Sequence, residues 1–237
     1  MNPVIYAVGD VHGRDDLLGT LHGYIVDYHS IIFPDRSAIL VHLGDYIDGG
    51  PESLAVIDRL IKGVPGFANV CLLGNHEALL LECLDTDDRQ VWNNWLNNGG
   101  TSTLASLGLS FPLGGYHPLP LIEALGKERI AWLRSLPNMY QTNTHLFVHA
   151  GIAPGVPIQD QDPKDLIWIR SRFLNSNADH GAIVVHGHTP ADDPVVRPNR
   201  ICVDTGATSN GVLTAAVLDG CNAPVFLRST ARPSNAR

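Results

Sequence analysis

Five short segments of the sequence combine glycine with Asp, Asn or His. They read Gly9-Asp10-Val11-His12-Gly13, Gly44-Asp45-Tyr46-Ile47-Asp48-Gly49-Gly50, Gly74-Asn75-His76-Glu77, His149-Ala150-Gly151 and His186-Gly187-His188-Thr189. Their oxygen and nitrogen donors, without thiolates, suit divalent ions such as Mn²⁺, Fe²⁺ or Zn²⁺. Two ions roughly 3.5–4 Å apart can clamp an in-line displacement at phosphorus and ionise a water near neutral pH. We therefore expect a two-metal hydrolytic site in which one carboxylate bridges the ions.

Predicted strands precede four of these segments. Apolar runs rich in β-branched residues indicate strands at Val4–Val8, Ala38–Leu43, Asn69–Leu73 and His145–Val148. Helical patterns follow the first three strands, at Asp15–Tyr28, Glu52–Ile61 and Glu77–Leu84. This alternation predicts an α/β domain with parallel pairing in its first third. Because ligands bind at the carboxyl ends of strands in such sheets, side chains from different strands can converge there.

Each segment alone has a simpler interpretation. A single Asp after a strand is usually a helix N-cap or a turn residue. His149 ends an apolar run and, taken alone, would more often be a hydrogen-bonded core residue. Gly74-Asn75 alone indicates a turn. The order and spacing of all five segments within one chain favour a shared site.

The strand rhythm stops between residues 85 and 143. Helix-like pieces at Val91–Asn97 and Leu121–Leu136 predict a helical insertion near the active site, over the strand ends. Strands return at Ala182–Val185, Ile201–Val203, Val212–Leu218 and Val225–Leu227. The close spacing of the last strands predicts an antiparallel portion. We expect a single domain over residues 1–228 and a frayed C-terminal tail over residues 229–237.

Composition limits the classes of function. The chain has 237 residues, 44% hydrophobic and 17% charged, which fits one domain with a sizeable core. Its net charge of −8 argues against a nucleic acid polymer as partner. The cysteines form no C-x-x-C pair, and no run approaches the roughly 18 apolar residues of a membrane span. We expect a cytoplasmic enzyme without a membrane partner, and the sequence leaves its oligomeric state open.

The five motifs together resemble the calcineurin-like metallophosphoesterases. The match spans Gly9 to Thr189, and Asp204-Thr205-Gly206-Ala207 also resembles bacterial members. The pattern is similar to the branch that holds serine/threonine protein phosphatases, the bacteriophage lambda phosphatase and symmetrical diadenosine tetraphosphatases. The resemblance implies an α/β fold in which two mixed β-sheets pack face to face and are flanked by helices.

The resemblance also implies a set of metal ligands and two divalent metal ions. Asp10 and His12 would bind the first ion, Asp45 would bridge the two ions, and Asn75, His149 and His188 would bind the second. Mn²⁺ is the first expectation for both ions, and the ligand set would also accept Fe, Zn or Co.

Other residues of the resemblance would act on the substrate. His76 would protonate the leaving-group oxygen and Asp48 would orient its imidazole, because a carboxylate partner favours the charged ring near neutral pH. Arg170 resembles the phosphate-gripping arginine of the family, with an ordinary helix-surface cation as the alternative, and Asn75 would also contact the phosphate. His186 would be either a partner of the metal ligands or a packed neighbour.

The sequence departs from the family pattern at Gly49 and Leu73, where two arginines are common. An Arg–phosphate pair is among the stronger charge-assisted contacts, so its loss needs an explanation. Arg170 and the metals could suffice for a small monoester. Another cation could reach the site, either Arg14 or an arginine of the insertion. The substrate could instead carry less charge at the scissile phosphorus, as a diester or an anhydride does.

The expected function is that of a metal-dependent phosphoesterase similar to protein serine/threonine phosphatases, with phosphotyrosine also open. A hydroxide that bridges two metals would attack phosphorus in phosphorylated proteins, peptides or small phosphoesters. The alternatives are a symmetrical diadenosine tetraphosphate hydrolase and a catalytically silent metal-binding scaffold. Trp92, Trp95 and Tyr116 of the insertion could roof the site and stack on a ring, but packing of the helix onto the domain is the favoured interpretation.

Overall fold

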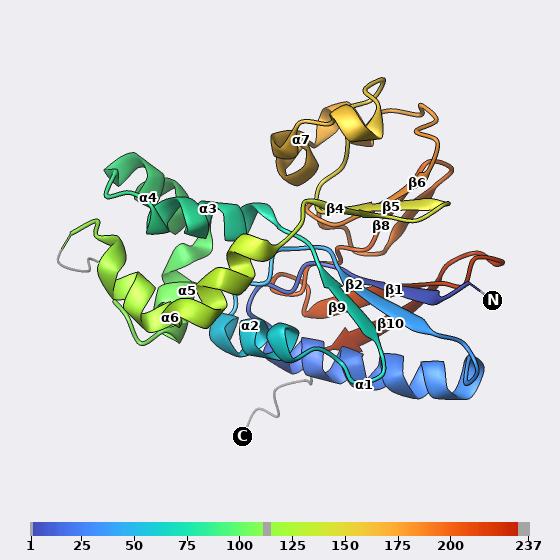
Figure 1. Cartoon of the computed structure of the whole chain (residues 1–237), viewed down its shortest axis with the longest axis horizontal. Helices are drawn as coiled ribbons and strands as arrows, with labels where there is room; N and C mark the ends of the chain where they lie inside the picture. The colour runs from blue at the N-terminus through green and yellow to red at the C-terminus, as the bar shows by residue number, and fades with distance from the viewer. Residues whose placement is uncertain (1, 111–114, 232–237) are drawn as a thin grey trace.

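The computed structural model describes residues 2–110 and 115–231, which contain two five-stranded β-sheets (Figure 1). The first sheet has the strand order β10-β9-β1-β2-β3 and the second has the order β4-β5-β6-β8-β7. The first sheet consists of β1 (Val4–Val8), β2 (Ala38–His42), β3 (Ala68–Cys71), β9 (Val212–Leu218) and β10 (Val225–Thr230). The second consists of β4 (Met139–Gln141), β5 (His145–Val148), β6 (Ile183–His186), β7 (Val195–Arg197) and β8 (Arg200–Cys202). Both sheets mix parallel and antiparallel pairs, as expected.

Strand β1 lies in the middle of the first sheet, parallel to β2 and antiparallel to β9. Its side chains alternate between two cores. Every second residue, beginning with Val4, packs in the cluster that includes helices α1 (Asp15–Ile32) and α2 (Ser53–Lys62). Ile5 and Ala7 pack between the two sheets. Because both faces are covered, all of β1 is buried and the strand is a continuous apolar run.

The second sheet is covered on its outer face by α7 (Pro163–Trp168) and α8 (Ser171–Leu174). Leu146 and Val148 of β5 pack toward these helices, whereas Phe147 packs between the sheets. Figure 1 shows the resulting layers, with α1 below the first sheet and α7 above the second. The expected sandwich of two sheets flanked by helices is therefore confirmed.

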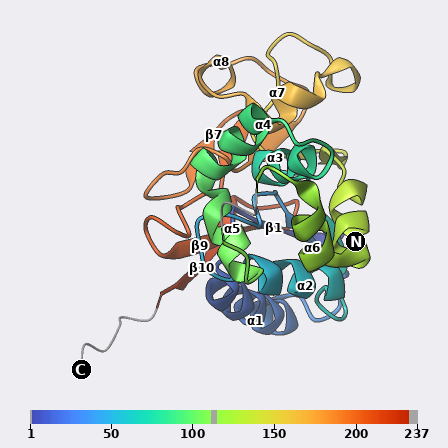
Figure 2. The same cartoon turned by 90° about the vertical axis from the view of Figure 1, so that its left-hand side faces the viewer.

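The helical insertion gathers at one side of both sheets (Figure 2). Helix α3 (Asn75–Leu84) leads into it, and it contains α4 (Arg89–Trp95), the π-helical turn η1 (Leu96–Gly100), α5 (Thr101–Ser106) and α6 (Pro118–Ser135). A 3₁₀ turn η2 (Ile158–Asp160) follows later in the chain. The expected end of the insertion at residue 143 was wrong. Met139–Gln141 instead form β4, which pairs with β5 as an antiparallel edge strand.

The expected C-terminal boundary also needs correction. Strand β10 continues to Thr230, past the predicted end of the domain at residue 228. The hydroxyl of Ser229 is buried and donates to the carbonyl of Leu17 at 2.9 Å, which fixes this strand against α1. Residues 232–237 of the expected tail lie outside the described residues. None of the helices in the described ranges is long and apolar enough to cross a membrane.

Candidate active site

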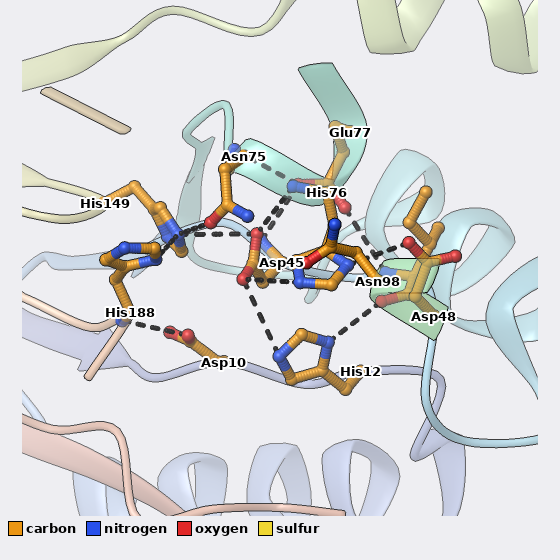
Figure 3. A network of polar contacts seen from close by, with 12 residues as sticks. Asp10, His12, Asp45, Asp48, Asn75, His76, Glu77, Asn98, His149 and His188 are labelled. Atoms are coloured by element: carbon orange, nitrogen blue, oxygen red, sulfur yellow. Dashed lines mark hydrogen bonds and ion pairs between the residues drawn. The ribbon is translucent and has the colours of Figure 1, made fainter. Parts of the chain in front are cut away.

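The Asp, Asn and His residues of the five motifs meet at the carboxyl ends of strands from both sheets (Figure 3). Asp10 and His12 follow β1, and Asp45 follows β2. His149 and His188 follow β5 and β6 of the other sheet. Figure 3 shows Asp45 at the centre, with His149 and His188 on one side of it and His12 and His76 on the other. The two sheets therefore contribute opposite halves of one site.

The backbone is strained at this site. Among the described residues, the non-glycine residues with positive φ are His12, Asp45, Asp48 and His188, with φ values of 46°, 54°, 68° and 64°. Residues with a side chain rarely adopt this region, because Cβ then crowds the carbonyl oxygen, and each case costs of order 1–3 kcal/mol. All four are motif residues, so the fold holds them against a local energetic preference.

In the neutral ring of His149, the nitrogen that faces the site carries no proton and lies close to oxygen atoms of other side chains. Its Nδ1–H donates to the carbonyl of Leu43 at 2.9 Å, which leaves Nε2 without a proton in the neutral ring. This Nε2 lies 2.9 Å from Oδ1 of Asn75, 3.2 Å from Nδ1 of His188 and 3.4 Å from Oδ1 of Asp45. The Oδ1 atoms of Asn75 and Asp45 carry no proton, so they repel a lone pair on Nε2 at these distances unless a cation lies among the three atoms. The donor set therefore fits a divalent metal ion.

A second cluster shares Asp45. The Nδ1–H of His12 donates to the carbonyl of Ile47 at 3.0 Å, and its Nε2 lies 3.6 Å from Oδ2 of Asp45. Nε2 of His76 lies 3.7 Å from the same oxygen. Burial opposes ionisation of Asp45, but His149, His76 and His12 hold its pKa well below its usual range. One ionised carboxylate thus lies between two groups of ring nitrogens.

Asp10 faces the site but lies outside both clusters. Its Oδ2 accepts from the backbone N–H of His188 at 2.9 Å, while the buried Oδ1 has no hydrogen-bond partner. Burial and the nearby carboxylates of Asp204 and Asp45 raise its pKa well above its usual range. A Cβ at Gly187 would overlap the Asp10 carboxylate, so only glycine permits this approach. An unpartnered buried carboxylate oxygen is suited to a bound cation.

The structure brings His76 and Asp48 together. Nδ1 of His76 lies 2.8 Å from Oδ2 of Asp48. Burial alone would lower the pKa of His76, but Asp45 and the hydrogen bond to Asp48 outweigh it and raise that pKa to about 9. Because Asp48 accepts the proton on Nδ1, the other ring nitrogen, Nε2, is directed toward Asp45 and the cleft.

Sequence reasoning missed three residues that hold the motif loops. Glu77 is fully buried and accepts backbone N–H groups of Asp45, Tyr46 and Gly74 at 2.9, 2.7 and 3.1 Å. Burial, with Asp45 nearby, raises the pKa of Glu77 to about 7. The motif itself contains this residue, so the signal was present. The other two are Trp95 and Thr103 of the insertion, which contact Asp48. Trp95 was expected only to pack the insertion or to roof the site, and nothing in the sequence linked either residue to Asp48.

The site opens into a cleft of about 290 Å³. Polar and aromatic side chains from three parts of the chain line it, namely Asn98, Trp168, Arg170, Asp204, Thr208 and Ser209. Arg170 is exposed, and its guanidinium makes no ion pair with a carboxylate in the described ranges. It precedes α8 rather than lying within a helix. Arg170 is therefore available to an anion in the cleft.

Packing bears on two alternatives from the sequence. Nδ1–H of His186 donates to the carbonyl of Gly187 at 3.0 Å and its ring packs edge-on against Phe173 at 5.1 Å, whereas its buried Nε2 has no hydrogen-bond partner among the described residues. Trp92 and Trp95 are fully buried and stack edge-on at 6.0 Å, so they pack the insertion and do not roof the cleft.

Comparison with known proteins agrees with this geometry. A family model for the calcineurin-like phosphoesterases matches residues 3–213. The chain is 31% identical over 223 residues to serine/threonine-protein phosphatase 2 of Escherichia coli (strain K12), covering 89% of this chain and 90% of that one. It is 28% identical over 224 residues to the asymmetrical bis(5'-nucleosyl)-tetraphosphatase PrpE of Anoxybacillus flavithermus (88% and 87% covered).

A solved structure shares the fold. The crystal structure of a cold-active protein-tyrosine phosphatase from a psychrophilic Shewanella species aligns with a TM-score of 0.59 at 18% identity, covering 98% of this chain and 81% of that one. Family match, fold and a convergent set of side chains that could hold metal ions agree. The chain therefore belongs to the calcineurin-like phosphoesterase family, a family of phosphatase hydrolases that depend on two metal ions.

Proposed function

We propose that the chain hydrolyses phosphomonoesters on protein serine and threonine side chains, by direct attack of water on phosphorus. The observation that carries this proposal is the position of Asp45 between two groups of ring nitrogens, beside the His76–Asp48 pair. Hydrolysis without a covalent intermediate needs a charged centre to activate water and an acid to protonate the leaving oxygen. Both kinds of group occur within one cleft.

The proposed ligand groups follow from the donor atoms. His149, His188 and Asn75, with Asp45, would hold one divalent ion, and His12 with Asp45 and Asp10 would hold the other. When bound, two such ions offset phosphoryl charge and lower the pKa of water toward neutrality. We propose Mn²⁺ for both positions, because mixed carboxylate, amide and imidazole donors accept it.

His76 is proposed as the general acid. Its Nδ1–H is held by Asp48, so a second proton on Nε2 points toward the cleft, where the leaving oxygen would lie. The hydrogen bond to the carboxylate of Asp48 favours the protonated form of the ring, which an acid needs near neutral pH. The acid matters most for an alkyl oxygen such as that of serine or threonine, because an alkoxide is a poor leaving group.

Arg170 is proposed to bind the phosphate, with Asn75 beside it. Arg14, an alternative cation, is already engaged: it pairs with both carboxylate oxygens of Asp16 at 2.8 and 2.7 Å and donates to the carbonyl of Ala207. At Gly49, where the family's arginine is absent, an added Cβ would lie 3.1 Å from the side-chain methyl of Thr208. Arg170 and the bound cations would therefore carry the phosphate charge.

Hydrolysis of a dinucleoside tetraphosphate is the second candidate. Trp168 lines the cleft next to Arg170, and its ring lies 6.1 Å from that of His188, so a base could stack near the metal ligands. A relative of similar length carries the name of a bis(5'-nucleosyl)-tetraphosphatase, which supports this candidate. The phosphotyrosine option is supported by a neighbour of known structure named as a protein-tyrosine phosphatase.

A direct comparison of substrates tests the proposal. We would measure kcat/KM with Mn²⁺ for a phosphothreonine peptide, a phosphotyrosine peptide and diadenosine tetraphosphate. A tenfold preference for the phosphothreonine peptide is the expected result, and a preference for the dinucleotide would overturn the assignment. In parallel, His76→Asn should keep the metal content and lower turnover of the peptide about 10²-fold or more. Absence of turnover on all three substrates, with metal bound, would favour the scaffold alternative.

A further inference from the structure

Two residues of the insertion donate hydrogen bonds to the carboxylate of Asp48. The indole Nε1–H of Trp95, at the end of α4, donates to Oδ2 of Asp48 at 3.0 Å. The hydroxyl of Thr103, in α5, donates to Oδ1 at 2.6 Å. Asp48 is fully buried, as is Trp95, and Thr103 is 1% exposed. Water therefore does not compete for these hydrogen bonds, and low local dielectric strengthens them.

The donors account for both oxygens of the carboxylate. Oδ2 accepts from Trp95 and from His76, while Oδ1 accepts from Thr103. Thr103 also receives the backbone N–H of Asp48 at 3.0 Å, so it contacts the residue at two points. With one oxygen fixed by each element, the carboxylate plane cannot rotate without breaking a buried hydrogen bond. The direction in which Oδ2 meets His76 is set by the insertion.

A break in the helix makes this arrangement possible. The π-helical turn η1 separates α4 from α5, and Gly99 within it has a φ of 102°. A Cβ at Gly99 would lie 3.2 Å from the backbone nitrogen of Gly49 and 3.4 Å from Cβ of Asp48. Glycine at this position lets the turn lie directly on the Asp48 loop, so that residues on both flanking helices reach the same carboxylate.

Trp92 shows that a buried indole N–H in this helix does not need Asp48 as its hydrogen-bond acceptor. It lies one turn earlier in α4 and is equally buried, yet its Nε1–H donates to the backbone carbonyl of Thr86 at 2.9 Å. The two tryptophans therefore share size, burial and helix, and differ in what their N–H groups contact. This pair offers a matched comparison between a packing role and a role at the site.

We propose that Trp95 and Thr103 are positioning residues for proton transfer, which fix Asp48 so that His76 directs Nε2 toward the leaving oxygen. The insertion thereby completes the acid side of the site. This inference rests on the proposed role of His76 as the general acid. It predicts that loss of either donor is felt in protonation of the leaving group rather than in metal binding.

The test uses two leaving groups of different acidity. Phenyl phosphate releases a phenol with a pKa of about 10, whereas 4-nitrophenyl phosphate releases a much more acidic phenol that hardly needs an acid. With Mn²⁺ present, Trp95→Phe should lower kcat for phenyl phosphate about tenfold and kcat for the nitrophenyl ester only about twofold. Thr103→Val should show the same bias, and Thr103→Ser, which restores the hydroxyl, should regain most of the rate.

Three controls separate the possible failures. Trp92→Phe should change both substrates equally, because it removes buried ring area without touching Asp48. Metal content, measured on each purified variant, should match the wild type. His76→Asn sets the maximum bias between the two esters. If His76→Asn shows no bias, the proposed acid is wrong. If it shows the bias but Trp95→Phe behaves as Trp92→Phe does and Thr103→Val as Thr103→Ser does, this inference alone is overturned.

Discussion

The described residues contain two groups of neighbouring histidines whose surroundings differ. One group surrounds Asp45 at the strand ends. The other is a pair on the opposite side of the first sheet, where Nε2 of His22 in α1 lies 2.9 Å from Nε2 of His42 in β2. His22 and His42 are buried, as are His149 and His188 at the site, whereas His12 and His76 are partly exposed. Both groups contain rings in edge-on contact.

The two groups differ in whether a carboxylate lies among their rings. The His22–His42 pair satisfies itself, with one ring donating to the other, and no carboxylate contacts either ring in the described part of the chain. Burial lowers the pKa of His22 to about 4 and that of His42 well below its usual value. At the site, by contrast, Asp45 raises the pKa of His149 against its burial. Burial of histidines alone therefore does not indicate a metal centre; convergence on an ionised carboxylate does.

Replacing the shared carboxylate should have the largest effect. Asp45→Asn leaves the size of the side chain unchanged but removes the charge that both clusters share. We expect kcat/KM to fall by about 10³-fold or more and the metal content to fall with it. His22→Gln, in the other group, should retain metal and full activity. Assays of both variants with metal analysis decide whether the two groups differ in kind, and equal losses would show that they do not.

The pH dependence of the unfolding free energy should show that burial keeps His22 neutral. An unfolded chain takes up a proton at His22 near pH 6.5, whereas the folded chain resists this until about pH 4. The stabilisation is therefore complete above pH 6.5 and is lost as the pH falls toward 4. The shift corresponds to about 3 kcal/mol, at about 1.4 kcal/mol per pKa unit.

His22→Gln isolates this contribution. The variant cannot titrate at this position, so the difference in unfolding free energy from the wild type should change by about that amount between pH 7 and 4. Urea unfolding at a series of pH values measures it. Asp10 and Asp204, whose raised pKa values act in the opposite direction, cancel in the difference. A difference that does not vary with pH would show that the pKa of His22 is the same in the folded and the unfolded chain.

Chelation of metal should affect only the first group. A ligand at about 100 times its Kd stabilises a protein by about 2.7 kcal/mol. Adding Mn²⁺ to chelated protein should therefore raise Tm by several degrees, and His22→Gln should show the same increase. The effect should be absent in Asp45→Asn. An increase that survives in Asp45→Asn would mean that the cations bind elsewhere.

We expect the smallest effect from replacement of Cys71, which contacts His42 of the His22–His42 pair. Sγ of Cys71 lies 3.7 Å from Nδ1 of His42, and burial raises the pKa of this thiol to about 12. Cys71→Ala removes a weak contact from a ring that keeps its stronger one. We expect a loss of about 1 kcal/mol or less in unfolding free energy and unchanged kcat/KM. A fall in activity would link this pair to the site after all.

The sequence predicted the strands that lie in the buried centres of the sheets. The bounds of β1, β5 and β9 match their predicted runs, because strands covered on both faces must be apolar throughout. Two of the four edge strands, β10 and β3, were also predicted, but the other two, β4 and β7, were missed. Each has three residues, none of them fully buried, so pairing with a neighbouring strand creates the element and no local pattern announces it.

The same distinction applies to the site. The Asp and His positions could be predicted because each motif places its residues directly after a strand. The contacts of Asp48 could not be predicted, because Trp95 and Thr103 lie 47 and 55 residues further along the chain. Their approach depends on a helix break at Gly99, whose sequence reads only as a turn. Long-range contacts made by packing leave no local pattern.

The central place of β1 has a consequence for synthesis. Ile5 is opposite Leu218, so β1 cannot complete its pairing until β9, far along the chain, has been made. Until β9 arrives, β1 keeps an open edge that can pair with other nascent chains. Contacts between such distant residues also slow folding. The nascent chain carries Asp10 and Asp45 long before His149 and His188 exist, so the two halves of the site come together only once both sheets have formed.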